Sequence, residues 1–165
     1  MARDHTPSRR RARVIAVLVA AFAVGGTAAT ELPASAASLP KGHDVSSHQK
    51  SVNWSSAKAK GAKFVYVKAT ESTNYVSPYF TRQYDGARNA GIIRGAYHFA
   101  LPNKSSGRAQ AAYFVNHGGG WKADGWTLPP ALDIEYNPYD RKHGCYGIRK
   151  ARMVPWNRSY SDEVG

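Results

Sequence analysis

Four short apolar runs alternate with longer polar or helix-like stretches, and this rhythm constrains the fold more than any other feature of the sequence. The runs are 42–46, 64–67, 92–99 and 131–135. Strands that alternate with helices are typical of α/β proteins with parallel sheets. We therefore expect four parallel strands connected by helices and loops.

The stretches between these runs carry helix signals, namely capping residue types at the start, apolar side chains at helical spacing, and Gly after the end. The predicted helices are 54–60, 78–89 and 105–116. Residues 121–130 predict a loop. Over residues 141–165 the pattern deteriorates, because Pro155 stands in the middle of what would otherwise be a helix.

The amino terminus has the pattern of an export signal. Arginines at 9–13 precede an apolar run at 14–24, and a small-x-small sequence follows at 34–36. A run of 11 apolar residues at a rise of about 1.5 Å each is too short for a hydrocarbon core of about 30 Å. We therefore expect a cleaved signal peptide at 1–36, an exported domain at 37–165, and no stable membrane anchor after cleavage.

The charge balance favours an anionic partner. The chain has 23 basic and 11 acidic residues, of which the predicted leader holds five and two, so that 18 and 9 remain with a net charge of +9. Nucleic acid, anionic lipid and anionic wall polymer all fit this charge. Export and the dispersed Lys and Arg residues argue against nucleic acid. The apolar content of 42% argues against disorder.

Four acidic residues lie at the predicted carboxyl ends of strands, where parallel α/β folds gather functional side chains. They are Asp44, Glu71, Asp133 and Glu135. Asp133 and Glu135 are two apart on one strand, so their side chains point to one face with Cα atoms about 6.6 Å apart. The more desolvated carboxyl of such a pair keeps its proton near neutral pH.

An acid beside a base or stabiliser is the minimum for cleaving a glycosidic bond. The alternatives from spacing alone are a solvated pair on an edge strand and a cation site. Aromatic side chains suitable for sugar rings flank the acids; they are Tyr66, Tyr97, Phe99, Trp126, Tyr136 and Tyr139. His43 and His48 lack a third ligand at metal-binding spacing, so we expect no metal and no cofactor.

Several ordered motifs between residues 40 and 160 together resemble glycoside hydrolase family 25, the Chalaropsis-type lysozymes. They are GHDVSSHQ at 42–49, VNW at 52–54, FVYVKATE at 64–71, GAYHF at 95–99 and LDIE at 132–135. The resemblance implies a secreted, cell-wall-associated N-acetylmuramidase that cleaves the β-1,4 bond between N-acetylmuramic acid and N-acetylglucosamine of peptidoglycan. It also implies an irregular (β/α) barrel of the glycosidase type.

Site roles follow from the same resemblance. Glu135 would be the proton donor, Asp133 would steady the charged intermediate, and Asp44 would line the groove as the third catalytic residue. Tyr97 and Glu71 would contact the substrate. Two further substrate-binding candidates are Tyr66 and Tyr136.

The chain also departs from the family. His43 stands where a small apolar residue is usual, and Lys50 where glycine is common. Only about the first four β/α units of the barrel are present, and 165 residues are too few for a complete barrel of about 250. By the same resemblance, Cys145 looks like the first cysteine of a disulfide whose second cysteine would lie downstream. We therefore expect a partial catalytic domain at 37–165, with a degenerate or truncated end at 141–165. The alternative function is a catalytically impaired fragment that binds the cell wall.

Overall fold

The computed structural model describes residues 39–165, and the predicted leader at 1–36 lies outside the described residues. The elements in chain order are β1 (Lys41–Val45), α1 (Trp54–Ala59), β2 (Ala62–Glu71), β3 (Tyr75–Val76), α2 (Phe80–Asn89), β4 (Ile93–Phe99), α3 (Gly107–Phe114), a π-helical turn (Val115–Gly119), β5 (Ala131–Asp133), a 3₁₀ turn (Arg141–His143) and α4 (Lys150–Val164). No helix among them is long and apolar enough to cross a membrane.

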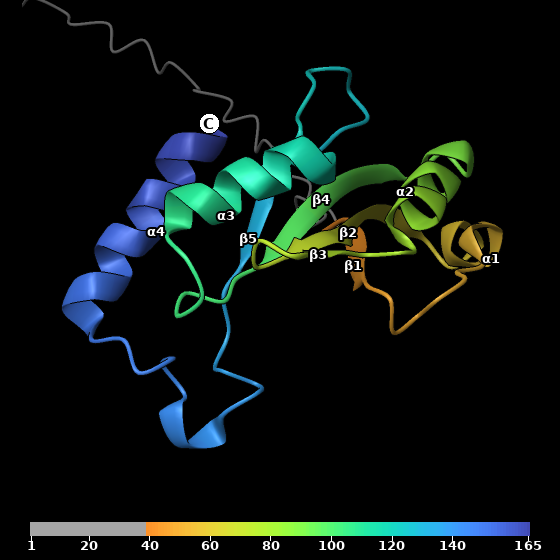
Figure 1. Cartoon of the computed structure of the whole chain (residues 1–165). Helices are drawn as coiled ribbons and strands as arrows, with labels where there is room; N and C mark the ends of the chain where they lie inside the picture. The colour runs from red at the N-terminus through yellow and green to blue at the C-terminus, as the bar shows by residue number, and fades with distance from the viewer. Residues whose placement is uncertain (1–38) are drawn as a thin grey trace, which may run out of the picture. The chain divides into compact units, whose positions relative to one another are not determined.

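The sheet has the order β1-β2-β4-β5, and all of these neighbours pair in parallel. Short β3 pairs with the end of β2 in the antiparallel direction. The strands lie in the middle of the molecule, with α1 and α2 toward one end and α3 and α4 toward the other (Figure 1). The predicted α/β class with a parallel sheet is thus confirmed.

The two faces of the sheet differ in burial, as the alternation of side chains along β2 shows. Val65, Val67 and Ala69 are fully buried under the helices. Phe64, Tyr66 and Lys68, which alternate with them, are only half-buried. One face therefore forms the dry core, and the other face is free to line a groove.

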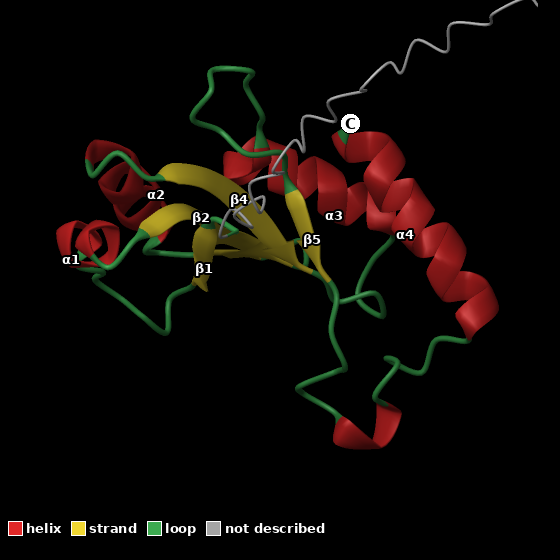
Figure 2. Cartoon of the chain, turned by 180° about the vertical axis from the view of Figure 1, so that it is seen from behind, coloured by secondary structure: helices red, strands yellow, loops and turns green. Residues whose placement is uncertain are grey.

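Two apolar clusters fasten the helices to the sheet. In the first, Trp54 of α1 and Ala87 of α2 pack on Val65 and Val67. In the second, Phe114 of α3 and Tyr160 of α4 pack on the opposite half of the sheet. Figure 2 shows α3 and α4 side by side next to β4 and β5.

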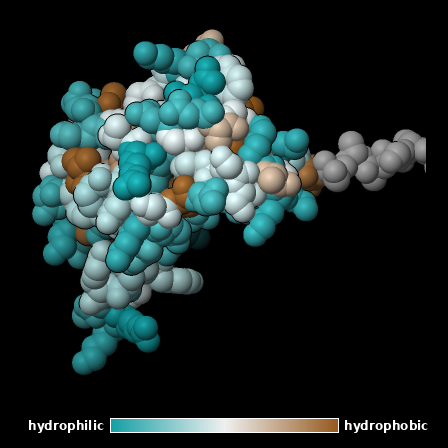
Figure 3. Space-filling view, turned by 90° about the vertical axis from the view of Figure 1, so that its right-hand side faces the viewer, coloured by the Kyte–Doolittle hydropathy of each residue, from teal (hydrophilic) through white to brown (hydrophobic). Residues whose placement is uncertain are grey.

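One face of the surface is mostly hydrophilic. Figure 3 shows one face on which hydrophobic side chains form only small separate patches among hydrophilic ones.

Strand lengths differ from the prediction. The strand predicted at 64–67 continues to Glu71, because Thr70 and Glu71 pair with both β4 and β3. The strand predicted at 131–135 ends at Asp133. Glu135 therefore lies just beyond β5 rather than within it.

Pro155 does not end the last helix, contrary to the expected deterioration of the pattern. It lies inside α4. Burial of Trp156 and Tyr160 against the second cluster offsets the backbone hydrogen bond that proline cannot donate.

Candidate active site

Five of the seven predicted site residues line one cavity at the carboxyl ends of the strands. The cavity has a volume of about 350 Å³, and its lining includes Asp44, Tyr66, Tyr97, Asp133 and Glu135. They come from four strands, with Asp133 and Glu135 both at the end of β5, as expected for a parallel sheet. Asp133 and Glu135 do share a face, although Glu135 lies beyond the strand.

The strand register and the small size of Gly95 determine where Tyr66 lies in this cavity, and side-chain alternation along β4 determines where Tyr97 lies. Tyr66 of β2 lies opposite Gly95 of β4, and a Cβ at Gly95 would come within 2.4 Å of the Tyr66 ring. The missing side chain thus lets the ring lie against β4, and its hydroxyl donates to the Pro129 carbonyl at 3.0 Å. Tyr97 faces the cavity while its neighbour His98 faces the core, as alternation along β4 requires.

The two carboxyls of the pair differ in environment. Burial, and next the negative charge of Glu135, raise the pKa of Asp133 to about 6, while the positive charge of Lys68 acts in the opposite direction. Glu135 is exposed. In the free chain, therefore, Asp133 keeps its proton closer to neutral pH than an ordinary aspartate does.

Burial also raises the pKa of Tyr97 far above its usual value, and the carboxylates of Asp133 and Asp44 add to the effect. The Tyr97 hydroxyl is therefore a neutral hydrogen-bonding group, and Tyr97 lines the cavity.

Glu71 and Tyr136 do not line this cavity. The Glu71 carboxylate contacts Lys68 Nζ and the Tyr139 hydroxyl, each at 2.5 Å. Tyr136 is 81% exposed and lines a separate cavity of about 590 Å³ together with Glu135 and Cys145. Substrate contact by Glu71 and Tyr136 stays a prediction.

Sequence reasoning missed Lys68, which comes directly after the strand predicted at 64–67. Lys68 lies within β2, with its Nζ atom 4.5 Å from the centre of the Phe99 ring. The sequence signal that could have found it is the spacing: Lys68 comes two residues after Tyr66, so in a longer strand both side chains point to the same face of the sheet.

His98 is held by hydrogen bonds in the core. Its Nδ1 atom lies 2.7 Å from Thr70 Oγ1 and its Nε2 atom 3.0 Å from Gln110 Oε1. Burial lowers its pKa. Within residues 39–165, no three His, Cys, Asp or Glu side chains gather as a metal site would require.

Comparisons with known proteins identify the family that shares this arrangement. The family model described as Glycosyl hydrolases family 25 matches residues 43–165, a range that includes all seven predicted site residues. The chain belongs to glycosyl hydrolase family 25. The resemblance seen in the motifs is thus confirmed.

Two curated family 25 relatives show the degree of similarity. The chain is 56% identical over 116 residues to lysozyme M1 of Streptomyces globisporus, covering 70% of this chain and 39% of that protein. It is 49% identical over 128 residues to the N,O-diacetylmuramidase of Chalaropsis sp, covering 74% and 58%. The chain therefore spans between about two fifths and three fifths of the length of these relatives.

Solved structures of the family share the fold. A bacterial lysozyme from Streptomyces coelicolor is 53% identical with a TM-score of 0.71, covering 74% of this chain and 56% of that one. A muramidase from Acremonium alcalophilum is 51% identical with a TM-score of 0.72, covering 74% and 58%. The parallel sheet of the described residues thus corresponds to part of a family 25 barrel, as predicted.

Proposed function

We propose that this chain carries a peptidoglycan-hydrolysing site, which cleaves the β-1,4 bond between N-acetylmuramic acid and N-acetylglucosamine. The observation that carries the proposal is the convergence of Asp133, Glu135 and Asp44 on one cavity in a family 25 chain. Tyr66 and Tyr97 supply flat apolar faces and hydroxyl groups beside the acids. Such surfaces suit sugar rings, whose faces are apolar and whose rims are hydroxylated.

Glu135 acts as general acid in this proposal, giving its proton to the oxygen of the leaving sugar as the glycosidic bond breaks. Asp133, as a carboxylate, steadies the positive charge that develops on the sugar left behind. A bound sugar covers the exposed Glu135 and removes water from it, and removal of water favours the neutral form of a carboxyl.

A second candidate function is a cell-wall binder that does not cleave. The exposure of Glu135 favours it, because a general acid needs a desolvated carboxyl to hold its proton near neutral pH. For either function, the Arg-rich start and the 34–36 sequence support export and action at the cell wall.

The deciding experiment is incubation of the chain with purified peptidoglycan, followed by borohydride labelling of new reducing ends. The muramidase proposal expects new reducing ends that are N-acetylmuramic acid. If the chain sediments with peptidoglycan but releases no new ends, the non-cleaving binder is favoured. If the chain neither binds peptidoglycan nor releases new ends, both proposals are wrong.

The proposed leader is tested separately. Mass spectrometry of secreted protein should show cleavage after Ala36, and a cell-retained chain with Met1 intact would contradict it.

A further inference from the structure

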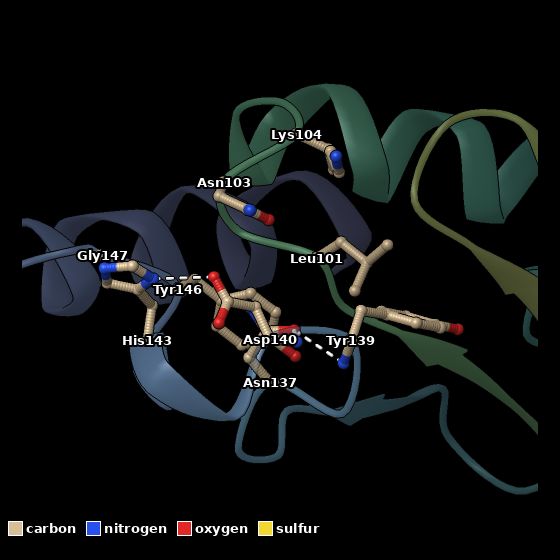
Figure 4. A pocket seen from close by; sticks show the side chains of 9 residues that line it. All are labelled: Leu101, Asn103, Lys104, Asn137, Tyr139, Asp140, His143, Tyr146 and Gly147. Carbon is tan, nitrogen blue, oxygen red and sulfur yellow. Dashed lines mark hydrogen bonds and ion pairs between the residues drawn. The ribbon is translucent and has the colours of Figure 1, made fainter.

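The segment between β5 and α4 folds into a compact loop with its own hydrogen bonds. The Asn137 side-chain oxygen accepts from the backbone N–H groups of Tyr139 at 3.0 Å and Asp140 at 3.1 Å. The Asn137 backbone N–H donates to the Gly144 carbonyl at 2.8 Å. His143 Nδ1 lies 2.7 Å from Asp140 Oδ2. Figure 4 shows these groups around a cavity of about 490 Å³. We name residues 136–146 the β5–α4 loop.

Two tyrosine hydroxyls attach this loop to the strand ends. The Tyr146 hydroxyl donates to the Ala100 carbonyl, just after β4, at 3.3 Å. The Tyr139 hydroxyl donates to Glu71 Oε1, at the end of β2, at 2.5 Å. In Figure 4 the Tyr139 side chain extends away from Asp140 and His143, which leaves it free to reach β2. The contact with Glu71 is the charged one, and hydrogen bonds to charged groups are the stronger kind.

Glu71 is itself held by Lys68. The Lys68 ammonium lies 2.5 Å from Glu71 Oε2, and the two side chains are only 13% and 14% exposed. Lys68 also lies over the rings of Phe99 at 4.5 Å and Tyr75 at 5.6 Å. Both carboxylate oxygens of Glu71 therefore have partners inside the protein, one from β2 and one from the β5–α4 loop.

We propose that Lys68 and Tyr139 are positioning residues that act through Glu71, and that this three-residue clasp holds the β5–α4 loop, and with it Glu135, against the end of β2. Glu135 directly precedes the loop, so loss of the clasp lets its backbone move relative to Asp133. The assignment of a catalytic effect rests on the proposed function, in which Glu135 is the proton donor. The clasp itself does not depend on the proposed function.

Lys68 has a second effect on the site. Its positive charge opposes the rise in the pKa of Asp133, whereas Glu135 and Asp44 add to that rise. Tyr97, which also faces Asp133, is neutral at all moderate pH values. Lys68 is thus a cation that acts directly on Asp133 and holds its pKa down.

Hydrogen exchange of the full chain tests the clasp without requiring activity. Tyr139→Phe removes one hydroxyl, and we expect amide exchange in the β5–α4 loop to accelerate by about tenfold or more, with exchange in β2 and β4 unchanged. Tyr113→Phe, on α3 and with no hydrogen bond from its hydroxyl in the described residues, is the matched control. Unchanged exchange in Tyr139→Phe, or equal changes in both variants, overturns the clasp.

Two substitutions of Lys68 separate positioning from general stability. Lys68→Met should accelerate loop exchange and shift the Asp133 carboxyl titration, followed by NMR, to higher pH; Lys68→Arg should restore both toward the parent values. Failure of Lys68→Arg to rescue either readout, or an Asp133 titration unmoved in Lys68→Met, contradicts the role of Lys68.

The peptidoglycan assay then links the clasp to the reaction. Tyr139→Phe should lower kcat by about tenfold with a smaller change in KM, because the clasp positions the acid rather than the sugar. A raised KM with unchanged kcat contradicts this link. If the parent chain releases no reducing ends, the proposed function fails, while the exchange and titration results still decide the clasp.

Discussion

Lys50 adopts a backbone conformation that a side chain disfavours. Its φ angle is +49°, in the left-handed region where a residue with a Cβ costs about 1–2 kcal/mol. Its carbonyl accepts from the Gln83 side chain at 2.9 Å, so a partly buried hydrogen bond holds the turn. The departure from the glycine common in the family therefore has a physical cost.

Lys50→Gly should stabilise the chain by up to about 1 kcal/mol, because relief of backbone strain exceeds the extra entropy of glycine in the unfolded state. Urea unfolding measures the change. Lys60→Gly is the control, since Lys60 has a φ of −80° and should lose rather than gain stability. Destabilisation by Lys50→Gly would show that the turn does not strain the backbone.

Glu135→Gln should reduce the release of reducing ends by about 10²- to 10⁴-fold and leave peptidoglycan binding largely intact, because glutamine keeps the shape but has no proton to give. Asp133→Asn should also lower the rate, through weaker stabilisation of positive charge. Glu163→Gln is the control, because Glu163 pairs with Arg108 at 3.5 Å on α4, outside the cavity. A Glu135→Gln rate equal to that of the parent would show that another group is the acid.

The raised pKa of Asp133 predicts a pH dependence of stability. The folded chain holds this proton up to a pH of about 6, whereas the unfolded chain loses it near 3.8. The contribution of Asp133 to stability is thus fully present below pH 3.8 and is lost as the pH rises through 6. Asp133→Asn should remove this slope and raise Tm at pH 7 by a few degrees. Asp85→Asn, at an exposed position, is the control and should leave the slope unchanged. If Asp133→Asn keeps the same dependence of stability on pH as the parent, the burial argument is wrong.

Among the secondary-structure elements, α4 shows that tertiary packing can outweigh the tendency of proline to interrupt a helix. A proline inside a helix costs about 3 kcal/mol, yet α4 continues through Pro155 because Trp156 and Tyr160 are buried against α3 and the sheet. The Trp156 indole also donates to the Ser105 carbonyl at 2.8 Å. This tertiary contact keeps α4 on the same side of the fold as the start of α3.

Pro155→Ala should therefore stabilise the chain by about 1–3 kcal/mol, because alanine restores a backbone donor and favours the helix. Thermal unfolding followed by far-ultraviolet circular dichroism measures the gain. Val154→Ala, at a 56% exposed neighbouring position, should change stability much less. Equal effects of the two substitutions would mean that Pro155 does not disturb α4.

At the scale of the whole molecule, the sheet is open at both sides. Within residues 39–165, β1 and β5 each have one neighbour in the main strand order, so their outer edges present unpaired backbone groups. Half-buried aromatic side chains such as Phe64 line the face away from the helices. Such edges and faces reduce stability and favour association.

We therefore expect the chain to unfold with a stability below about 5 kcal/mol, the low end for globular domains, and to bind a hydrophobic dye before unfolding. Calorimetry, dye fluorescence and light scattering on the purified chain measure these properties together. A monomer with a sharp transition at high temperature and no dye binding would contradict the expectation.

Local patterns were sufficient to predict much of this protein. The strand and helix rhythm, the capping residue types before the helices and the shared face of Asp133 and Glu135 depend on neighbours within a few residues. Asn53, for example, accepts from the Ser56 N–H at 2.9 Å at the start of α1. Such short-range periodicities are written directly in the sequence. The family motifs extended these patterns to a barrel-type site, and the cavity brings five of the seven named residues together.

Only the tertiary structure decided the features that depend on distant contacts. β2 extends to Glu71 because β3 and β4 pair with its end, and α4 passes through Pro155 because α3 lies beneath it. The contact between Glu71 and Tyr139 joins residues 68 positions apart, and no periodicity encodes such a pairing. Whether a carboxylate faces a cavity, an ammonium or a hydroxyl is set by which surfaces folding brings together, and this determines its chemistry.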